Sequence, residues 1–504
     1  MGSEIELHQA TYSFLRTQIE FGFYRPGDTL PAMEELCRQA HISLDTVKLA
    51  YQRLQDEGYI SLLPKAGARV IVKYDAKEVD RHIQVYFAQR KTALLDLSQA
   101  LPPLLSWAQW LSLKHSPAGA LGGLEKLASA SHKSPNLIWR HIQLMYGDLG
   151  NELLMRLLRH IYLYFQGPFY SVPGNEVYFD RGLNWQRKIA TYSSRGQWDD
   201  LAQVLQAAHN DLSHVVMGFY TENIAVAPLQ EETSFKWSAY KKSSQLRYTL
   251  AIGLLTDISR GVYPPGSYLP PAERLAAEKG VSLSTVRRAI ALLNSLGAVK
   301  SSRTLGARVL PPAESTENCD FTQANIGSRL LDMTAGLQIY ALSAKAVAKI
   351  TLSALDDSAL GQWQRRLSHL QNGQRYELVT YTSLELIAQF APYSTIRSIY
   401  AELLRLLFWG NPLRGKRGKP EDNLSFFNDF FNRMLKALAT KDFSSFAAIL
   451  EELLLHELRF TADMLKQLGL REVDSILIPE PEESWDWGED ESMLWSPRGI
   501  QYEK

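Results

Sequence analysis

The sequence is poor in cysteine and contains no long apolar run. Cys37 and Cys319 are the only cysteines among 504 residues, too few for a disulfide framework or for a cysteine-rich zinc site. No segment reaches the roughly 18 uninterrupted apolar residues that a membrane span needs, and the chain does not open on a basic stretch followed by an apolar run. These absences predict a cytoplasmic chain with no membrane partner.

The chain also lacks an excess of charge of either sign. Its 54 Lys and Arg residues balance 54 Asp and Glu residues. A zero sum can hide a local basic patch, so the charge has to be counted region by region. Apolar residues make up 45% of the chain, enough for several buried cores, and the length predicts about three to four domains.

A repeat with a constant offset of 239 residues organises the chain. From Pro26 and Pro265 onward, the two copies align without a gap over 45 residues. Identical pairs include Gly27 and Gly266, Leu30 and Leu269, Pro31 and Pro270, Ser43 and Ser282, Thr46 and Thr285, Gly58 and Gly297, and Gly67 and Gly306. The alignment predicts one domain that occurs twice, at residues 4–74 and 244–311.

The pattern within each copy predicts three helices and a β-hairpin. Apolar residues at helical intervals indicate a first helix, which a Pro-Gly turn ends. A proline then suits the opening of a second helix, and Ser43 or Ser282 suits the N-cap of a third. Gly58 or Gly297 is expected to end this third helix, and two strands follow, at residues 59–63 and 68–74 in the first copy. This order is that of a winged helix-turn-helix, whose recognition helix enters the major groove of DNA.

The two copies resemble the DNA-binding domain of GntR regulators. The resemblance rests on PGDTLPAMEELCRQAHISLDTVKLAYQRLQDEGYI in the first copy and PGSYLPPAERLAAEKGVSLSTVRRAIALLNSLGAV in the second. It implies that DNA faces the start of each recognition helix, and basic residues of helix and wing complete the expected contact set. The full set is Ser43, Thr46, Lys48, Lys65 and Arg69 in the first copy, and Ser282, Ser284, Thr285, Arg287, Arg288, Arg303 and Arg308 in the second.

The copies differ in their expected attraction for DNA. Residues 244–311 hold nine basic and three acidic residues, a net charge of plus six, whereas residues 4–74 hold eight basic and nine acidic residues, a net charge of minus one. Leu44 and Leu283 replace an arginine that is common in the family, and Asp45 adds a negative charge to the first recognition helix. Because phosphate neutralisation supplies most non-specific affinity, the second copy is expected to bind more strongly.

The remaining segments predict a mainly α chain in which the winged helices alternate with all-helical domains. Residues 75–228 and 325–472 have helical periodicity and resemble each other, so the whole two-domain unit is expected to be duplicated. Residues 229–243 are expected to form a linker. Residues 473–504 form an acidic tail that contains tryptophan.

In GntR relatives a helical domain commonly binds an effector and dimerises, which implies an unknown small-molecule effector and a possible homodimer. WRHIQLMYGDLGNELL at residue 139 is similar to the motif of the FCD subclass, which binds a metal through an aspartate and several histidines. Only His141 and His209 stand near the expected places, and Leu137 takes the position of the aspartate. Neither a metal nor a cofactor is therefore expected.

These observations favour a sequence-specific transcription regulator with double-stranded DNA as its partner, and not an enzyme. One alternative is a non-specific DNA-bridging or protein-interaction protein with degenerate DNA-binding domains. Another is a MocR-type fusion to a pyridoxal-phosphate domain. The second winged helix interrupts the space that such a domain needs, and no Schiff-base lysine motif is evident.

Overall fold

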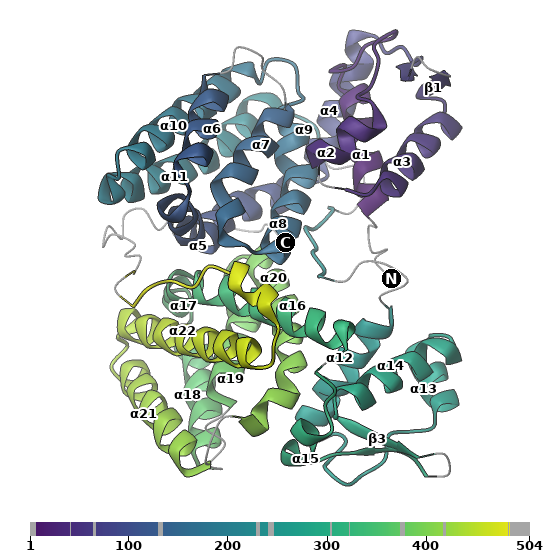
Figure 1. The fold of residues 1–504 in the computed structure, drawn as a ribbon. Coiled ribbons are helices and arrows are strands. Elements are labelled where there is room, and N and C mark those ends of the chain that lie inside the picture. The colour runs from purple at the N-terminus through teal and green to yellow at the C-terminus, as the bar shows by residue number, and fades with distance from the viewer. Residues whose placement is uncertain are drawn as a thin grey trace. The chain divides into compact units, whose positions relative to one another are not determined.

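The computed structural model describes residues 7–40, 42–63, 67–129, 135–227, 232–239, 246–302, 305–321, 323–372, 378–416, 420–481 and 483. It divides the chain into two compact units, residues 1–237 and residues 238–504, with residues 393–395 grouped with the first. Each unit combines a winged helix-turn-helix with a helical domain (Figure 1). The predicted fold class, mainly α with two winged helices, is confirmed.

The first winged helix contains three helices and a two-stranded hairpin. The helices are α1 (Leu7–Glu20), α2 (Met33–Ala40) and α3 (Leu44–Asp56). The strands β1 (Ile60–Leu63) and β2 (Gly67–Val70) pair antiparallel, with Ile60 opposite Val70 and Leu63 opposite Gly67. The second strand, expected to reach Tyr74, ends at Val70 because its partner strand has only four residues.

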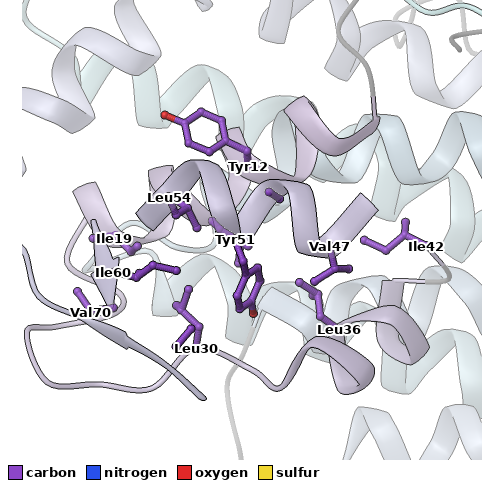
Figure 2. Packing of buried hydrophobic residues seen from close by; sticks show 13 residues of the cluster. Tyr12, Ile19, Leu30, Leu36, Ile42, Val47, Tyr51, Leu54, Ile60 and Val70 are labelled. Atoms are coloured by element: carbon purple, nitrogen blue, oxygen red, sulfur yellow. The ribbon is translucent and has the colours of Figure 1, made fainter. Parts of the chain in front are cut away.

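The core of this domain gathers around α3 (Figure 2). Val47, Ala50, Tyr51 and Leu54 recur at helical intervals and are almost fully buried, so one face of α3 is apolar. The side chains packed on this face are Tyr12, Leu15, Ile19, Leu30, Leu36, Ile42, Ile60, Ala68 and Val70. Burial of each large apolar side chain contributes about 1.5–3 kcal/mol, which fixes α3 with its opposite face toward solvent.

The second winged helix repeats the first with every element displaced by 239 residues. It consists of α12 (Leu246–Ser259), α13 (Ala272–Lys279), α14 (Leu283–Ser295), β3 (Val299–Ser302) and β4 (Gly306–Val309). Its strand register, from Val299 opposite Val309 to Ser302 opposite Gly306, is that of the first hairpin. A short helix, α15 (Pro312–Glu317), follows. The sequence repeat therefore corresponds to a structural repeat.

The helical domain of the first unit begins at α4 (Ala76–Ala88) and α5 (Lys91–His115). It continues with α6 (Ala118–Ala128), α7 (Pro135–Tyr146), η1 (Gly147–Leu149), α8 (Glu152–Ile161), the π-helical turn η2 (Tyr162–Gln166), α9 (Gly167–Phe169), α10 (Glu176–Ser194) and α11 (Trp198–Asn223). Helix α5 is buried along most of its length and packs against α11. Part of the expected linker packs here too, because Phe235 and Trp237 are buried.

The helical domain of the second unit contains α16 (Ala324–Ala341), α17 (Ala344–Ser353), α18 (Asp357–Asn372), α19 (Val379–Phe390), α20 (Ser394–Leu406), η5 (Leu407–Lys416), α21 (Pro420–Ala439), α22 (Phe443–Gln467) and η6 (Arg471–Ser475). The start of the expected tail packs on this domain, since Val473 and Ile476 are buried and Arg459 donates to the Pro479 carbonyl oxygen at 2.9 Å. The tail tryptophans lie outside the described residues. In the part of the chain that the structure describes, no helix is both long and apolar enough to span a bilayer.

Candidate DNA-binding surface

Both recognition helices begin at a serine N-cap of the same geometry. Ser43 has φ −69° and ψ 150°, and Ser282 has φ −67° and ψ 148°. Each hydroxyl accepts a hydrogen bond from the backbone N–H of the threonine three residues later, at 3.2 Å in both copies. The cap stabilises the helix by about 1 kcal/mol. It also leaves the positive end of the helix dipole near the solvent, where a phosphate can bind.

The two predicted threonines hold the caps in place. The Thr46 hydroxyl lies 2.7 Å from that of Ser43, and the Thr285 hydroxyl lies 2.8 Å from that of Ser282. Thr46 is only 7% exposed, whereas Thr285 is half-buried. The structure therefore places Thr46 inside the first domain, beneath the exposed Ser43.

The outward faces of the two recognition helices differ in charge. In the first domain the exposed positions are Leu44, Asp45, Lys48 and Leu49, in which one acid offsets one base and two leucines reach solvent. The corresponding positions of the second domain are Leu283, Ser284, Arg287 and Arg288, of which the last three are exposed. This face therefore carries two positive charges and no negative one. Leu49 is 56% exposed where the second domain has Arg288, a difference that was not predicted from the sequence.

Arg287 is exposed and makes only a weak ion pair. Its guanidinium lies 3.6 Å from the Glu273 carboxylate, and both side chains are about two-thirds exposed. An ion pair this exposed contributes at most about 1 kcal/mol, so a phosphate can displace the carboxylate. Arg288, next along α14, is exposed as well.

The wing adds a basic pair in the second domain. Lys300 lies directly opposite Arg308 across the two strands, so the two side chains emerge on the same face. Arg308 also pairs with Glu314 of α15 at 3.3 Å. In the first domain Arg69 lies opposite Ser61 instead. Lys300 was missing from the predicted set, although its place in the expected wing of a strongly basic domain signals it. The predicted wing residues Lys65 and Arg303 lie outside the described residues.

A family model for bacterial regulatory proteins of the gntR family matches residues 7–70 and again residues 249–309. Both matches coincide with the winged helices. The chain therefore contains two winged helix-turn-helix domains of the GntR type.

Two relatives each match a short stretch of this chain. An uncharacterized HTH-type transcriptional regulator of Escherichia coli (strain K12), YdcR, is 42% identical over 53 residues, which are 10% of this chain and 11% of that protein. Another from the same organism, YieP, is 39% identical over 66 residues, 13% of this chain and 29% of that protein. The matches thus span less than a third of either relative.

Solved GntR-type structures also align with this chain. Streptococcus agalactiae GntR is 18% identical, with 42% of this chain and 99% of that structure covered and a TM-score of 0.20. Escherichia coli McbR/YncC is 16% identical, with 43% and 99% covered and a TM-score of 0.22.

Of the two histidines considered as metal ligands, His141 is buried and His209 is half-buried, both in the first helical domain. The Nδ1 atom of His141 lies 2.9 Å from the Leu137 carbonyl oxygen, and that of His209 lies 2.8 Å from the Ser106 hydroxyl. Burial lowers the pKa of His141 and of His209 to about 4 in each case. Within the described ranges, no group of three or more His, Cys, Asp or Glu residues is placed to hold a metal ion.

The buried His141 predicts a loss of stability in mild acid. Burial lowers its pKa from 6.5 to about 4, so the unfolded chain takes up a proton below pH 6.5 while the folded chain does not. Its contribution to stability is full above pH 6.5 and falls as the pH drops toward 4. Between pH 7 and pH 5 we expect a loss of about 2 kcal/mol, since one pKa unit corresponds to about 1.4 kcal/mol.

The measurement compares urea unfolding of the wild type and a His141→Asn variant at pH 7 and pH 5. The variant cannot take up the proton, so its free energy of unfolding should fall by about 2 kcal/mol less over this interval. His214→Asn is the control, because His214 is exposed. An equal pH response of the wild type and His141→Asn would contradict the prediction.

Proposed function

We propose that the chain is a DNA-binding transcription regulator in which the second GntR domain supplies most of the affinity. The observation that carries this proposal is the exposed pair Arg287 and Arg288 on a recognition helix with a serine-capped start. Lys300 and Arg308 extend the basic surface onto the wing. Guanidinium groups on such a helix suit both phosphate contacts and bidentate hydrogen bonds to guanine.

The first GntR domain has a supporting role in this proposal. Its recognition helix exposes Asp45 and two leucines, which offer phosphate no net attraction. Covalent linkage nevertheless turns its DNA contact into an intramolecular step, which raises the overall affinity wherever a second half-site matches the spacing. The helical domains would sense the signal that regulates binding, and a homodimer would present four winged helices.

The test is footprinting of the full chain on its own upstream DNA and on random DNA at two salt concentrations. A specific regulator is expected to protect a defined site at least about 1000-fold more tightly than random sequence. Equal binding to both DNAs, with a steep salt dependence, would favour the non-specific DNA-bridging protein instead. Lack of binding to either DNA would overturn both functions.

A further inference from the structure

The first helical domain contains a small, mainly apolar cavity that is partly open to solvent. Its volume is about 140 Å³, and its walls come from α5, α7, α8, α10, α11 and the π-helical turn η2. Apolar wall residues include Leu101, Leu105, Ile142 and Leu158. An apolar cavity of about 150 Å³ in another protein binds benzene, so this one has room for a single ring.

Two glutamines of the cavity wall, Gln166 and Gln186, have amide oxygens without a hydrogen-bond partner in the part of the chain that the structure describes. The Oε1 atoms of Gln166 and Gln186 are shielded from solvent and have no hydrogen-bond partner among the described residues. In contrast, the amide of Gln109 is occupied, since it donates to the Met145 sulfur at 2.9 Å and accepts from the Tyr146 hydroxyl at 3.2 Å. A buried acceptor without a partner is costly, so a ligand that supplies an O–H or N–H donor gains from binding here.

The cavity wall offers no unbalanced charge. Arg181 is the basic residue of the wall and Asp211 the acidic one, and they pair with each other, since Arg181 Nε donates to an Asp211 carboxylate oxygen at 2.7 Å. Trp185 also donates to this carboxylate, at 2.8 Å. His209 is neutral at physiological pH, because burial lowers its pKa to about 4. A charged ligand would lose its hydration without gaining an opposite charge.

We propose that this cavity binds an uncharged molecule of one ring that carries an O–H or N–H donor, with phenol as the simplest representative. Its ring would contact the apolar wall, and its donor would bond to the amide of Gln166 or Gln186. The further claim, that this ligand regulates DNA binding, rests on the proposed function.

The cavity lies next to the contact between the helical domain and the first winged helix. Gln166 is the last residue of η2, and the next residue, Gly167, contacts Phe14 of α1. This contact is so close that a Cβ atom at Gly167 would lie 2.5 Å from the Phe14 ring. The rings of Phe14 and Tyr162 are 5.6 Å apart. A π-helical turn is an irregularity that often marks a functional site. A ligand held by Gln166 therefore acts on the segment that positions the first winged helix.

The experiment is calorimetric titration of the full chain, without DNA, with phenol, toluene and benzoate. Phenol should bind about tenfold more tightly than toluene, because one added hydrogen bond is worth about a factor of ten, and benzoate should bind at least tenfold more weakly than phenol. The double variant Gln166→Met and Gln186→Met should remove the preference for phenol over toluene. Benzoate binding as tightly as phenol would overturn the proposed ligand class.

A matched pair of variants tests the location. Ala208 lines the cavity, so Ala208→Phe should fill it and abolish phenol binding, whereas Ala207 is exposed and Ala207→Phe should bind phenol like the wild type. Circular dichroism and thermal melting check that both variants are folded. Phenol binding that survives Ala208→Phe would place the ligand elsewhere and overturn the proposal.

A last measurement distinguishes a failure of the ligand site from a failure of the proposed function. DNA affinity is measured with and without saturating phenol, and a change of at least threefold is expected in the wild type but not in Ala208→Phe. If phenol binds in the cavity and DNA affinity stays constant, the signalling role is wrong while the ligand site stands. If the chain binds no DNA at all, the regulator function is wrong, and the titrations still decide the ligand site.

Discussion

Replacing Gly297 by alanine is expected to lower the free energy of unfolding of the second unit by about 4 kcal/mol. Gly297 has φ +67°, a left-handed conformation that costs a side-chain-bearing residue about 1–2 kcal/mol. An added Cβ would also lie 2.1 Å from the Ser315 carbonyl oxygen and 2.9 Å from the Cys319 nitrogen. Both are backbone atoms, so α15 would have to move.

Displacement of α15 would also disturb its hydrogen bonds to the helical domain. Thr316 donates to the Pro412 carbonyl oxygen at 2.7 Å, and Asn411 donates to the Ser315 hydroxyl at 3.1 Å. Through these bonds α15 joins the second winged helix to η5 of its own helical domain. The substitution is therefore expected to loosen the attachment of the winged helix as well as to destabilise it.

The repeat provides a matched control for this substitution. Gly58 is the equivalent residue of the first domain and has φ +79°, but no heavy atom lies within 4 Å of a Cβ built there. Gly58→Ala is expected to cost only the backbone strain, about 1 kcal/mol. Urea unfolding followed by circular dichroism gives both values, and hydrogen exchange in α14 shows which transition belongs to the second unit. Equal losses for the two variants would rule out the proposed clash.

These two glycines show how far the sequence predicts the fold. The repeated Gly58 and Gly297 correctly indicate the end of each recognition helix, because a left-handed residue is a local requirement. The offset of 239 residues likewise predicts every helix and strand of the second winged helix from the first. The contact of Gly297 with α15 was not predictable, since it depends on how a segment outside the repeat packs against it.

The candidate DNA-binding surface is likewise predictable where local sequence determines it and unpredictable where packing does. The caps at Ser43 and Ser282 follow from local sequence, and the structure contains both. In contrast, the burial of Thr46 and the exposure of Leu49 depend on the packing of α3 against its neighbours, and a motif comparison does not report packing. The cavity is less predictable still, because its wall combines residues of five helices and a π-helical turn that are far apart in the sequence.

Replacing Arg287 and Arg288 together by alanine is expected to weaken DNA binding about 100-fold, since each arginine contact with DNA is worth about 1–3 kcal/mol. If both arginines contact phosphate, the slope of log K against log salt concentration should fall by about 2. Alanine favours the helix, and both side chains are exposed, so α14 should remain folded. The measurement is a salt series of electrophoretic mobility shifts with circular dichroism of the free protein.

The equivalent positions of the first domain again supply the control. Lys48→Ala with Leu49→Ala removes one positive charge from a face that Asp45 already neutralises, so the expected loss is less than about fivefold. Asp45→Ser introduces the residue found at position 284 and should raise the affinity by about threefold, because it removes a repulsion for phosphate. Equal losses for the two double variants would contradict the unequal roles of the two GntR domains. A larger loss in the first domain would reverse them.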